Sequence, residues 1–183
     1  MAQVPVSTDV LTRAIRQRVE NYYDAHGLCC SEAILFVINK GLGGGLNDDM
    51  VRQLGAGFCG GMGGGEGVCG ALAGAVAALG LILGPGRRHG LTKSKMRLAS
   101  KQLHDSFLEA LRSTSCFDLS APYAGEPKAR MKNCKSITGL GAELCAKTIF
   151  SFRPKVALSA DIEFLNRNDS KAQAVMQKIG AFF

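Results

Sequence analysis

One uncharged apolar run constrains this chain more than any other feature. Residues 68–84 read VCGALAGAVAALGLILG and contain no charged side chain. A helix that is apolar on all sides lies either inside a protein core or in a membrane. The run has seventeen residues, whereas a bilayer requires about 20, and no second apolar segment accompanies it. We therefore predict a central buried helix rather than a membrane segment, and the spacing of Gly70 and Gly74 favours close helix packing.

Glycine is concentrated around this run, because 18 of the 23 glycines lie between Gly41 and Gly90. Residues 55–67, GAGFCGGMGGGEG, are too rich in glycine to form a regular element. Residues 55–60 match the G-x-G-x-x-G pattern, but no strand precedes them and no phosphate-binding P-loop pattern is present. Nucleotide binding is therefore a weak alternative.

The other apolar residues recur at spacings of three and four, which predicts amphipathic helices. The expected helices cover residues 8–26, 30–40, 47–57, 92–114 and 134–150, with a last helical segment from Ser159 that is interrupted near 166–169. Cys116 is expected to close the long helix, and no segment alternates with the period of a strand. The predicted fold class is all-α, a compact bundle of about five to seven helices around the buried Gly/Ala-rich helix. Residues 1–150 form the predicted domain, and 151–183 are its helical extension.

Composition and charge exclude several classes of protein. Apolar residues make up 46% and charged residues 20%, so the chain is expected to bury a core and is not a disordered tail. The net charge is +7, and residues 91–150 hold ten Lys/Arg against five Asp/Glu. These basic residues are not interleaved with aromatic ones, which favours a solvated face over a nucleic-acid surface. The N-terminal residues show no secretory signal pattern, so we expect a cytoplasmic protein.

The seven cysteines lack every closely spaced motif. No C-x-x-C pair marks a zinc ribbon or a thioredoxin site, and no C-x-x-C-H attaches a c-type haem. In a reducing compartment, unpaired thiols, metal ligands or catalytic thiols are expected more than structural disulfides. Four cysteines lie at or near a predicted helix end, where backbone N–H groups can point at a thiol; they are Cys30, Cys69, Cys116 and Cys134.

Cys69 is the strongest candidate, because it begins the buried helix directly after the glycine-rich stretch. The nearby Gly65, Gly67 and Gly70 lack side chains, so a cofactor or another helix can approach the backbone closely. The alternative is that Cys69 is a small buried apolar residue, which is the common fate of a free cysteine. The three remaining cysteines are interpreted as packing residues, with the first two as alternative auxiliary ligands; they are Cys29, Cys59 and Cys145.

The context of the four cysteines resembles a known family of redox-active proteins, which is defined by four spaced cysteines and a Cys-Gly-Ala-x-x-Gly motif. That motif corresponds to residues 69–74, CGALAG. Cys30 precedes an apolar helix, Cys116 follows the long helix, and Cys134 precedes an Ala-rich amphipathic helix, as in the family. The resemblance covers about residues 20–150. The family is similar to the C-terminal part of split-Soret cytochromes c, but the haem motif is missing here, so haem chemistry is not expected.

The resemblance implies a small helical homodimer whose four cysteines form an iron–sulfur site or a redox-active thiol set. We expect Cys30, Cys69, Cys116 and Cys134 to bind a [2Fe–2S] or [4Fe–4S] cluster and to exchange electrons with a redox partner protein. Scattered cysteines favour iron–sulfur over Zn²⁺, which normally uses closely spaced ligand pairs. Two alternatives stay open: a thiol–disulfide protein with Cys69 as the nucleophile and Cys30 or Cys116 as the resolving thiol, and a structural zinc or interaction protein.

Overall fold

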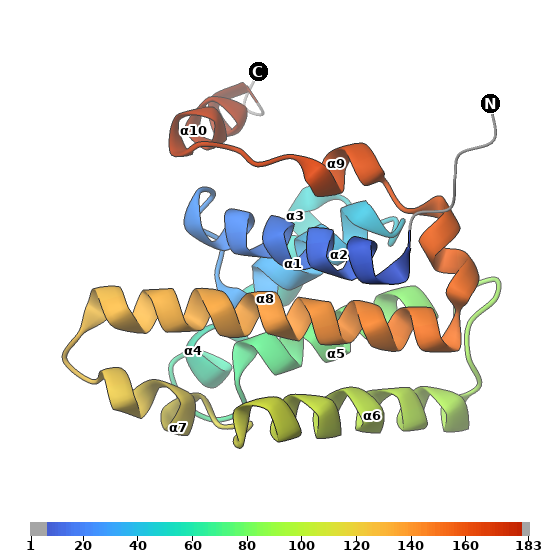
Figure 1. Cartoon of the computed structure of the whole chain (residues 1–183), viewed down its shortest axis with the longest axis horizontal. Helices are drawn as coiled ribbons and strands as arrows, with labels where there is room; N and C mark the ends of the chain where they lie inside the picture. Colours follow the sequence, from blue (N-terminus) through green and yellow to red (C-terminus); the bar gives the residue numbers. More distant parts are fainter. Residues whose placement is uncertain (1–6, 181–183) are drawn as a thin grey trace.

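The computed structural model describes residues 7–180 and is an all-α protein (Figure 1). The described residues form ten α-helices and two short 3₁₀ helices. In chain order they are α1 (Thr8–Asp24), α2 (Cys30–Gly41), α3 (Asp48–Ala56), α4 (Cys59–Met62), α5 (Gly70–Leu83), α6 (Lys93–Leu111), α7 (Cys116–Ser120), η1 (Ala121–Tyr123), α8 (Pro127–Phe152), η2 (Pro154–Ser159), α9 (Ile162–Asn166) and α10 (Lys171–Gly180).

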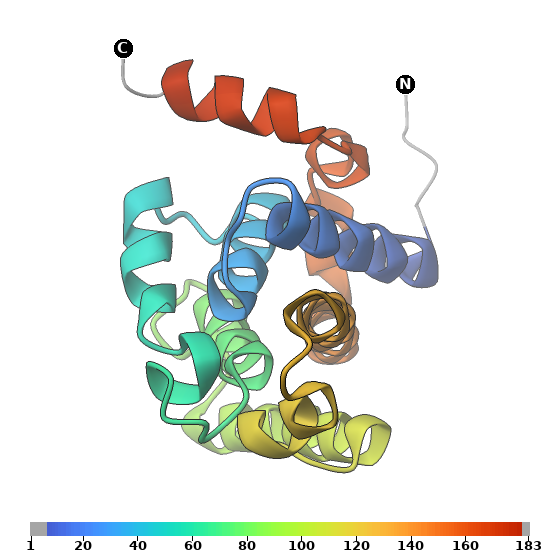
Figure 2. The ribbon, with the colours of Figure 1, turned by 90° about the vertical axis from the view of Figure 1, so that its left-hand side faces the viewer.

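The predicted buried helix is α5, and it lies at the centre of the bundle. It packs against α2, α6 and α8, and the view along the bundle shows it among these three helices (Figure 2). No residue of α5 is fully exposed, and Ala71, Ala75 and Leu79 have no accessible surface. Burial on every side explains why this helix carries no charged residue, since an unpaired charge there would lose its hydration.

Polar caps begin the helices near the predicted positions. The Asn47 side chain accepts a hydrogen bond from the Met50 backbone N–H (2.8 Å), and Thr92 caps α6 in the same way through Lys95. Such caps satisfy backbone donors that have no partner within the helix. The predicted helices over 8–26, 30–40, 47–57 and 92–114 therefore agree with the structure to within about three residues at each end.

The structure corrects the prediction in the region between α6 and α8. Cys116 does not close the long helix but begins the separate helix α7, and α8 starts at Pro127 rather than at Cys134. Proline at the first helical position needs no intrahelical donor. The first two turns of α8 are mostly solvent-exposed, so they lack the apolar period that sequence reasoning follows. Cys134 consequently lies inside a helix and not at its end.

The predicted number of helices, about five to seven, is too low for the part of the chain that the structure describes. Seven of the ten helices are long, and the other three, α4, α7 and α9, have four or five residues each. Helices α4 and α7 fall outside the predicted helices, whereas α9 lies in the helical segment that was predicted from Ser159. Helices this short carry no usable apolar period, because they complete little more than one turn.

The segment after α8 packs back onto the bundle. Helix η2 contacts α8, and α9 contacts α1 and α2. Leu165 of α9 is buried and covers Gly41 at the end of α2. A buried ion pair between Arg18 of α1 and Asp169 (3.0 Å) fastens the chain after α9 to the first helix.

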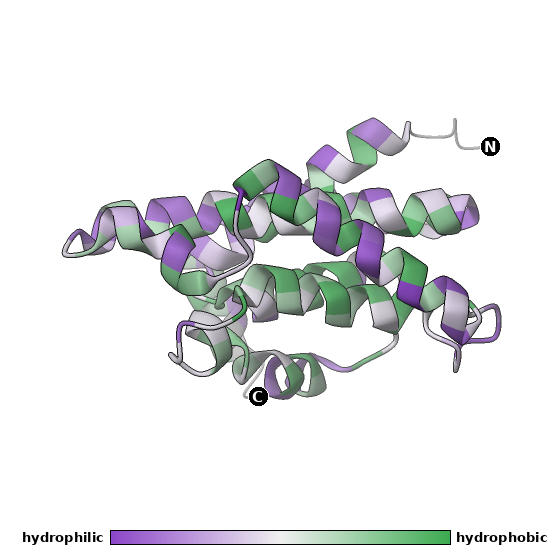
Figure 3. Cartoon of the chain, turned by 90° about the horizontal axis from the view of Figure 1, so that it is seen from below, coloured by the Kyte–Doolittle hydropathy of each residue, from purple (hydrophilic) through white to green (hydrophobic). Residues whose placement is uncertain are grey.

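Hydrophilic residues are spread over the outer helices, including α6, whereas α5 is hydrophobic throughout (Figure 3). Among the described residues, no helix combines the length and the apolar character that crossing a bilayer demands.

Candidate functional site

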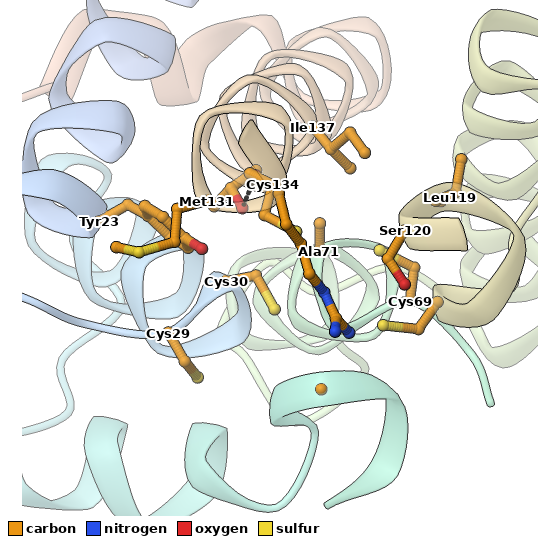
Figure 4. Close-up of a pocket in the computed structure, with 15 residues that line it drawn as sticks. Tyr23, Cys29, Cys30, Cys69, Ala71, Leu119, Ser120, Met131, Cys134 and Ile137 are labelled. Atoms are coloured by element: carbon orange, nitrogen blue, oxygen red, sulfur yellow. Dashed lines mark hydrogen bonds between the residues drawn. The ribbon is translucent and has the colours of Figure 1, made fainter. Parts of the chain in front are cut away.

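Four thiols from four different helices line one cavity of about 220 Å³ (Figure 4). Cys30 is the first residue of α2, Cys69 caps α5, Cys116 is the first residue of α7, and Cys134 lies in the second turn of α8. We call this site the four-thiol cavity. Its other walls are mostly apolar or small, with Ser120, Thr138 and Arg130 as the polar exceptions; the remaining lining residues are Tyr23, Cys29, Gly60, Gly70, Ala71, Leu119, Met131 and Ile137.

Missing side chains on α5 let Cys30 reach the cavity. A Cβ atom on Gly70 would lie 2.5 Å from Cys30 Sγ and 2.6 Å from the carbonyl oxygen of Phe58. One helical turn later, a Cβ on Gly74 would lie 2.6 Å from the Cα of Ser31. Both distances are far below normal contact, so only glycine fits at these two positions. The predicted close packing around the Gly70 to Gly74 spacing is thus realised between α5 and α2.

A short backbone ladder holds Cys69 and Cys116 beside each other. The Cys69 N–H donates to the carbonyl of Thr114 (2.7 Å), and the Cys116 N–H donates to the carbonyl of Gly67 (2.7 Å). The glycine-rich loop then folds over Cys116, because a Cβ on Gly61 would lie 2.5 Å from the Cβ of Cys116. Gly61 also has a φ of +73°, which L side chains rarely adopt.

Arg130 and Tyr23 add polar contacts to the sulfur atoms. The Arg130 side chain, one turn before Cys134 on α8, lines the cavity with Cys116 and lowers the pKa of that thiol. Tyr23, at the end of α1, lines the cavity with Cys134 and lowers the pKa of that thiol. Sequence reasoning had assigned Arg130 to a solvated basic face and had given Tyr23 no role. The position of Arg130 four residues before Cys134 is a usable signal once α8 is known to include both, since such residues share a helix face.

The cavity disfavours the charged form of every thiol in it. Burial, followed by the nearby Cys69 thiol, raises the pKa of Cys30 to about 12. Burial also raises the pKa values of Cys69, Cys116 and Cys134, although Arg130 partly offsets the effect at the last two. The four thiols are therefore protonated at neutral pH in the free protein. A metal or cluster that needs thiolate ligands must displace these protons.

The four sulfur atoms are spread more widely than around a single ion. Tetrahedral Zn²⁺ with Zn–S bonds of about 2.3 Å places its sulfur ligands about 3.8 Å apart. Among the described residues, the one group of three or more His, Cys, Asp or Glu ligand atoms that all lie within 4.8 Å of one another is Cys29, Glu32 and Cys59. The four-thiol cavity thus has room between its sulfur atoms for a group larger than one metal ion.

Cys29 and Cys59, which had been interpreted as packing residues, form a disulfide with a Cα–Cα distance of 5.9 Å. The expectation that unpaired thiols prevail holds for the other five cysteines. Cys145 is a packing residue, as predicted, because it is fully buried on α8 and its thiol donates to the carbonyl of Ala75 (3.3 Å).

The predicted cofactor glycines occupy different environments. Gly70 lines the four-thiol cavity, whereas Gly65 and Gly67 lie in the exposed part of the loop and do not line it. Gly67 contributes through its carbonyl, which accepts the hydrogen bond from the Cys116 N–H.

A comparison with protein families decides the family of the chain. The model of the family described as "Putative redox-active protein (C_GCAxxG_C_C)" matches residues 28–148. The chain belongs to this family. No curated protein and no solved structure gives a significant match.

The segment that matches the redox-active family holds the main parts of the site. It includes the four cavity thiols, the Cys29–Cys59 disulfide and Arg130. Tyr23 lies before the segment, on α1, and the Arg18–Asp169 pair lies outside it at both ends. Helix α1 and the C-terminal elements therefore lie outside the matched segment, which contains the four cavity thiols.

Proposed function

We propose that this member of the redox-active family is an electron-transfer protein that binds an iron–sulfur cluster in the four-thiol cavity. The observation that carries the proposal is the convergence of four thiols, from helices far apart in the sequence, on one cavity. The ligands would be Cys30, Cys69, Cys116 and Cys134. Sets of four thiolates suit iron–sulfur clusters, and a bound cluster supplies one-electron transfer.

The residues present suit such a group in three respects. The sulfur atoms are separated more widely than single-ion ligands. Backbone N–H groups at the starts of α2 and α5 lower the pKa values of Cys30 and Cys69 against the larger effect of burial. Donors of this kind stabilise thiolates and tune the reduction potential of a cluster. The Arg130 guanidinium adds a positive charge next to a site that would gain negative charge when the thiols deprotonate.

The two alternatives find less support. A structural zinc site would require the sulfur atoms to move together, because no three of them lie within 4.8 Å of one another in the described part of the chain. Thiol–disulfide chemistry with Cys69 as nucleophile would require a thiolate, yet burial raises the pKa of this thiol. A thiol that stays protonated reacts slowly with disulfides.

The first test is a spectrum of protein purified without oxygen, with iron, sulfide and zinc counted on the same sample. Visible absorbance with equal amounts of iron and sulfide supports the proposal. Colourless protein that holds stoichiometric zinc contradicts it in favour of a structural site, and colourless protein without metal contradicts it in favour of thiol chemistry.

Single substitutions then assign the ligands. Cys69→Ser and Cys116→Ser are each expected to remove most of the bound iron and the visible absorbance. Cys145→Ser is the matched control, because this cysteine is buried in the same bundle but donates to a backbone carbonyl outside the cavity. Full iron content in Cys69→Ser would refute the ligand assignment.

A further inference from the structure

The Cys29–Cys59 disulfide lies at the edge of the four-thiol cavity without belonging to the proposed ligand set. Cys29 lines the cavity and directly precedes Cys30, whereas Cys59 does not line it and begins α4 on the outer side. Both cysteines are partly accessible to solvent. A small thiol can therefore reach this disulfide from outside without entering the cavity.

The polar groups around the disulfide can accept hydrogen bonds from both thiols that reduction would produce. The Ser31 hydroxyl lies 3.3 Å from Cys29 Sγ and 3.7 Å from Cys59 Sγ. Its own proton is donated to the carbonyl of Gly55 (2.7 Å), so its lone pairs are left to accept from a thiol. The same Gly55 carbonyl lies 3.9 Å from Cys59 Sγ and is a second acceptor. The reduced pair thus has acceptors for both of its S–H groups, so reduction leaves neither thiol without a partner.

Cys29 is the better placed of the two sulfur atoms to leave as a thiolate. It is the N-cap residue of α2, a helix of twelve residues, and it forms a capping box with Glu32. In this box the Glu32 carboxylate accepts from the Cys29 N–H (2.9 Å), and the backbone N–H of Glu32 points at the Cys29 side chain. A backbone donor and the positive end of the helix dipole both stabilise negative charge on that sulfur.

We propose that Cys29 and Cys59 form a second redox centre, a reversible two-electron disulfide/dithiol couple that an external thiol reduces. The thiolate of a dithiol attacks Cys59 Sγ, the Cys29–Cys59 bond breaks, and Cys29 leaves as a thiolate that takes up a proton. The second thiol of the reductant then attacks the mixed disulfide, so that Cys59 is released as a thiol. The chain gains two electrons and two protons, and the dithiol becomes a disulfide. This couple does not depend on a cluster in the four-thiol cavity.

The test equilibrates the whole protein, without oxygen, in mixtures of reduced and oxidised dithiothreitol, and then alkylates the thiols for peptide mass mapping. We expect Cys29 and Cys59 to gain label together in one two-electron transition and to lose it again in the more oxidising mixtures. The inference is overturned if the folded protein keeps the disulfide in the most reducing mixture, as a structural bridge would. It is also overturned if both residues stay alkylatable in the most oxidising one.

Glutathione tests the order of attack, because the first step with a monothiol leaves a mixed disulfide that persists until another thiol attacks it. After a short exposure and alkylation, the mass map is expected to place glutathione on Cys59 and the alkyl group on Cys29. The reverse placement would refute the assigned order.

Two variants separate this inference from the proposed function. The double variant Cys29→Ser with Cys59→Ser is expected to lose the two-electron transition while it keeps its iron and sulfide, and Cys145→Ser is expected to keep both. Parent protein that lacks iron but shows the transition would refute the cluster proposal alone. Parent protein that holds iron but shows no transition would refute the second redox centre alone.

Discussion

Replacing Gly70 by alanine tests whether the close approach of α2 and α5 positions Cys30. The added methyl would lie 2.5 Å from Cys30 Sγ and 2.6 Å from the Phe58 carbonyl oxygen. The carbonyl belongs to the backbone and cannot rotate away, so α4, α5 or the Cys30 side chain must shift by most of an ångström. Forcing a methyl group into a close-packed site costs about 1–3 kcal/mol, and this strain falls on a cavity wall.

Gly80→Ala is the matched control, because Gly80 lies in the same helix and a Cβ there would meet no atom within 4 Å. Alanine in a helix interior is more favourable than glycine by about 0.5–1 kcal/mol. The two variants should therefore differ in the free energy of unfolding by about 1.5–4 kcal/mol, with opposite signs relative to the parent. For a chain of this size, that corresponds to a difference in melting temperature of roughly 3–16 °C.

The assay is thermal and urea unfolding of metal-free, reduced protein followed by helical circular dichroism, with iron per chain counted separately after anaerobic purification. We expect Gly70→Ala to lower both the stability and the iron content, and Gly80→Ala to lower neither. A Gly70→Ala protein that matches the parent in stability and in iron content would refute the steric argument, and with it the role of this glycine in placing Cys30.

Three further outcomes follow from the charges and thiols. Burial opposes ionisation of Asp169, but the hydrogen bond with His26 and the charge of Arg18 outweigh it. They hold the pKa of this carboxyl below its usual value. The stability that results is fully present above the unfolded-state pKa of about 4 and is lost as the pH falls through the lower folded-state pKa. Urea unfolding at pH 7 and at pH 3 should show a smaller loss of stability on acidification for Asp169→Asn than for the parent, and equal losses would contradict this. Arg130→Met should raise the pKa of Cys116 further and shift its alkylation profile to higher pH, since the guanidinium favours the thiolate; an unchanged profile would exclude this contact. The pKa values of all four cavity thiols are raised, so Cd²⁺ binding should release protons, and the affinity should increase from pH 6 to pH 8. The binding is read from the cadmium–thiolate absorbance, and an affinity that does not change with pH would refute this prediction.

Most of the helices could be predicted because each has a local cause. The apolar run of residues 68–84 has no favourable environment except the interior. Asn47 and Thr92 cap their helices through hydrogen bonds from residues three positions later, so these caps do not depend on the rest of the fold. The start of α8 could not be predicted in the same way. Its first turns face solvent at one end of the bundle, so the apolar pattern begins only where the helix reaches the core.

One part of the candidate site could be predicted from local sequence, and the other part depends on contacts between helices. Cys69 and Gly70 are marked locally, since a thiol and a bare backbone begin a helix after a flexible loop. The contacts of Arg130 with Cys116 and of Tyr23 with Cys134 join residues from different helices. The Cys29–Cys59 disulfide also depends on where α4 lies relative to α2, and no spacing in the sequence expresses that distance.

Taken alone, the sequence determined that the chain is helical, that one helix is buried, and which family its cysteines resemble. These properties depend on hydrophobic period, helix caps and glycine content, which act over a few neighbouring residues. Only the tertiary structure decided that four thiols share one cavity, that two other cysteines are bonded, and that the exposed Arg130 side chain lines the same cavity. Such pairings depend on how whole helices pack, and packing is a property of the complete core rather than of any segment.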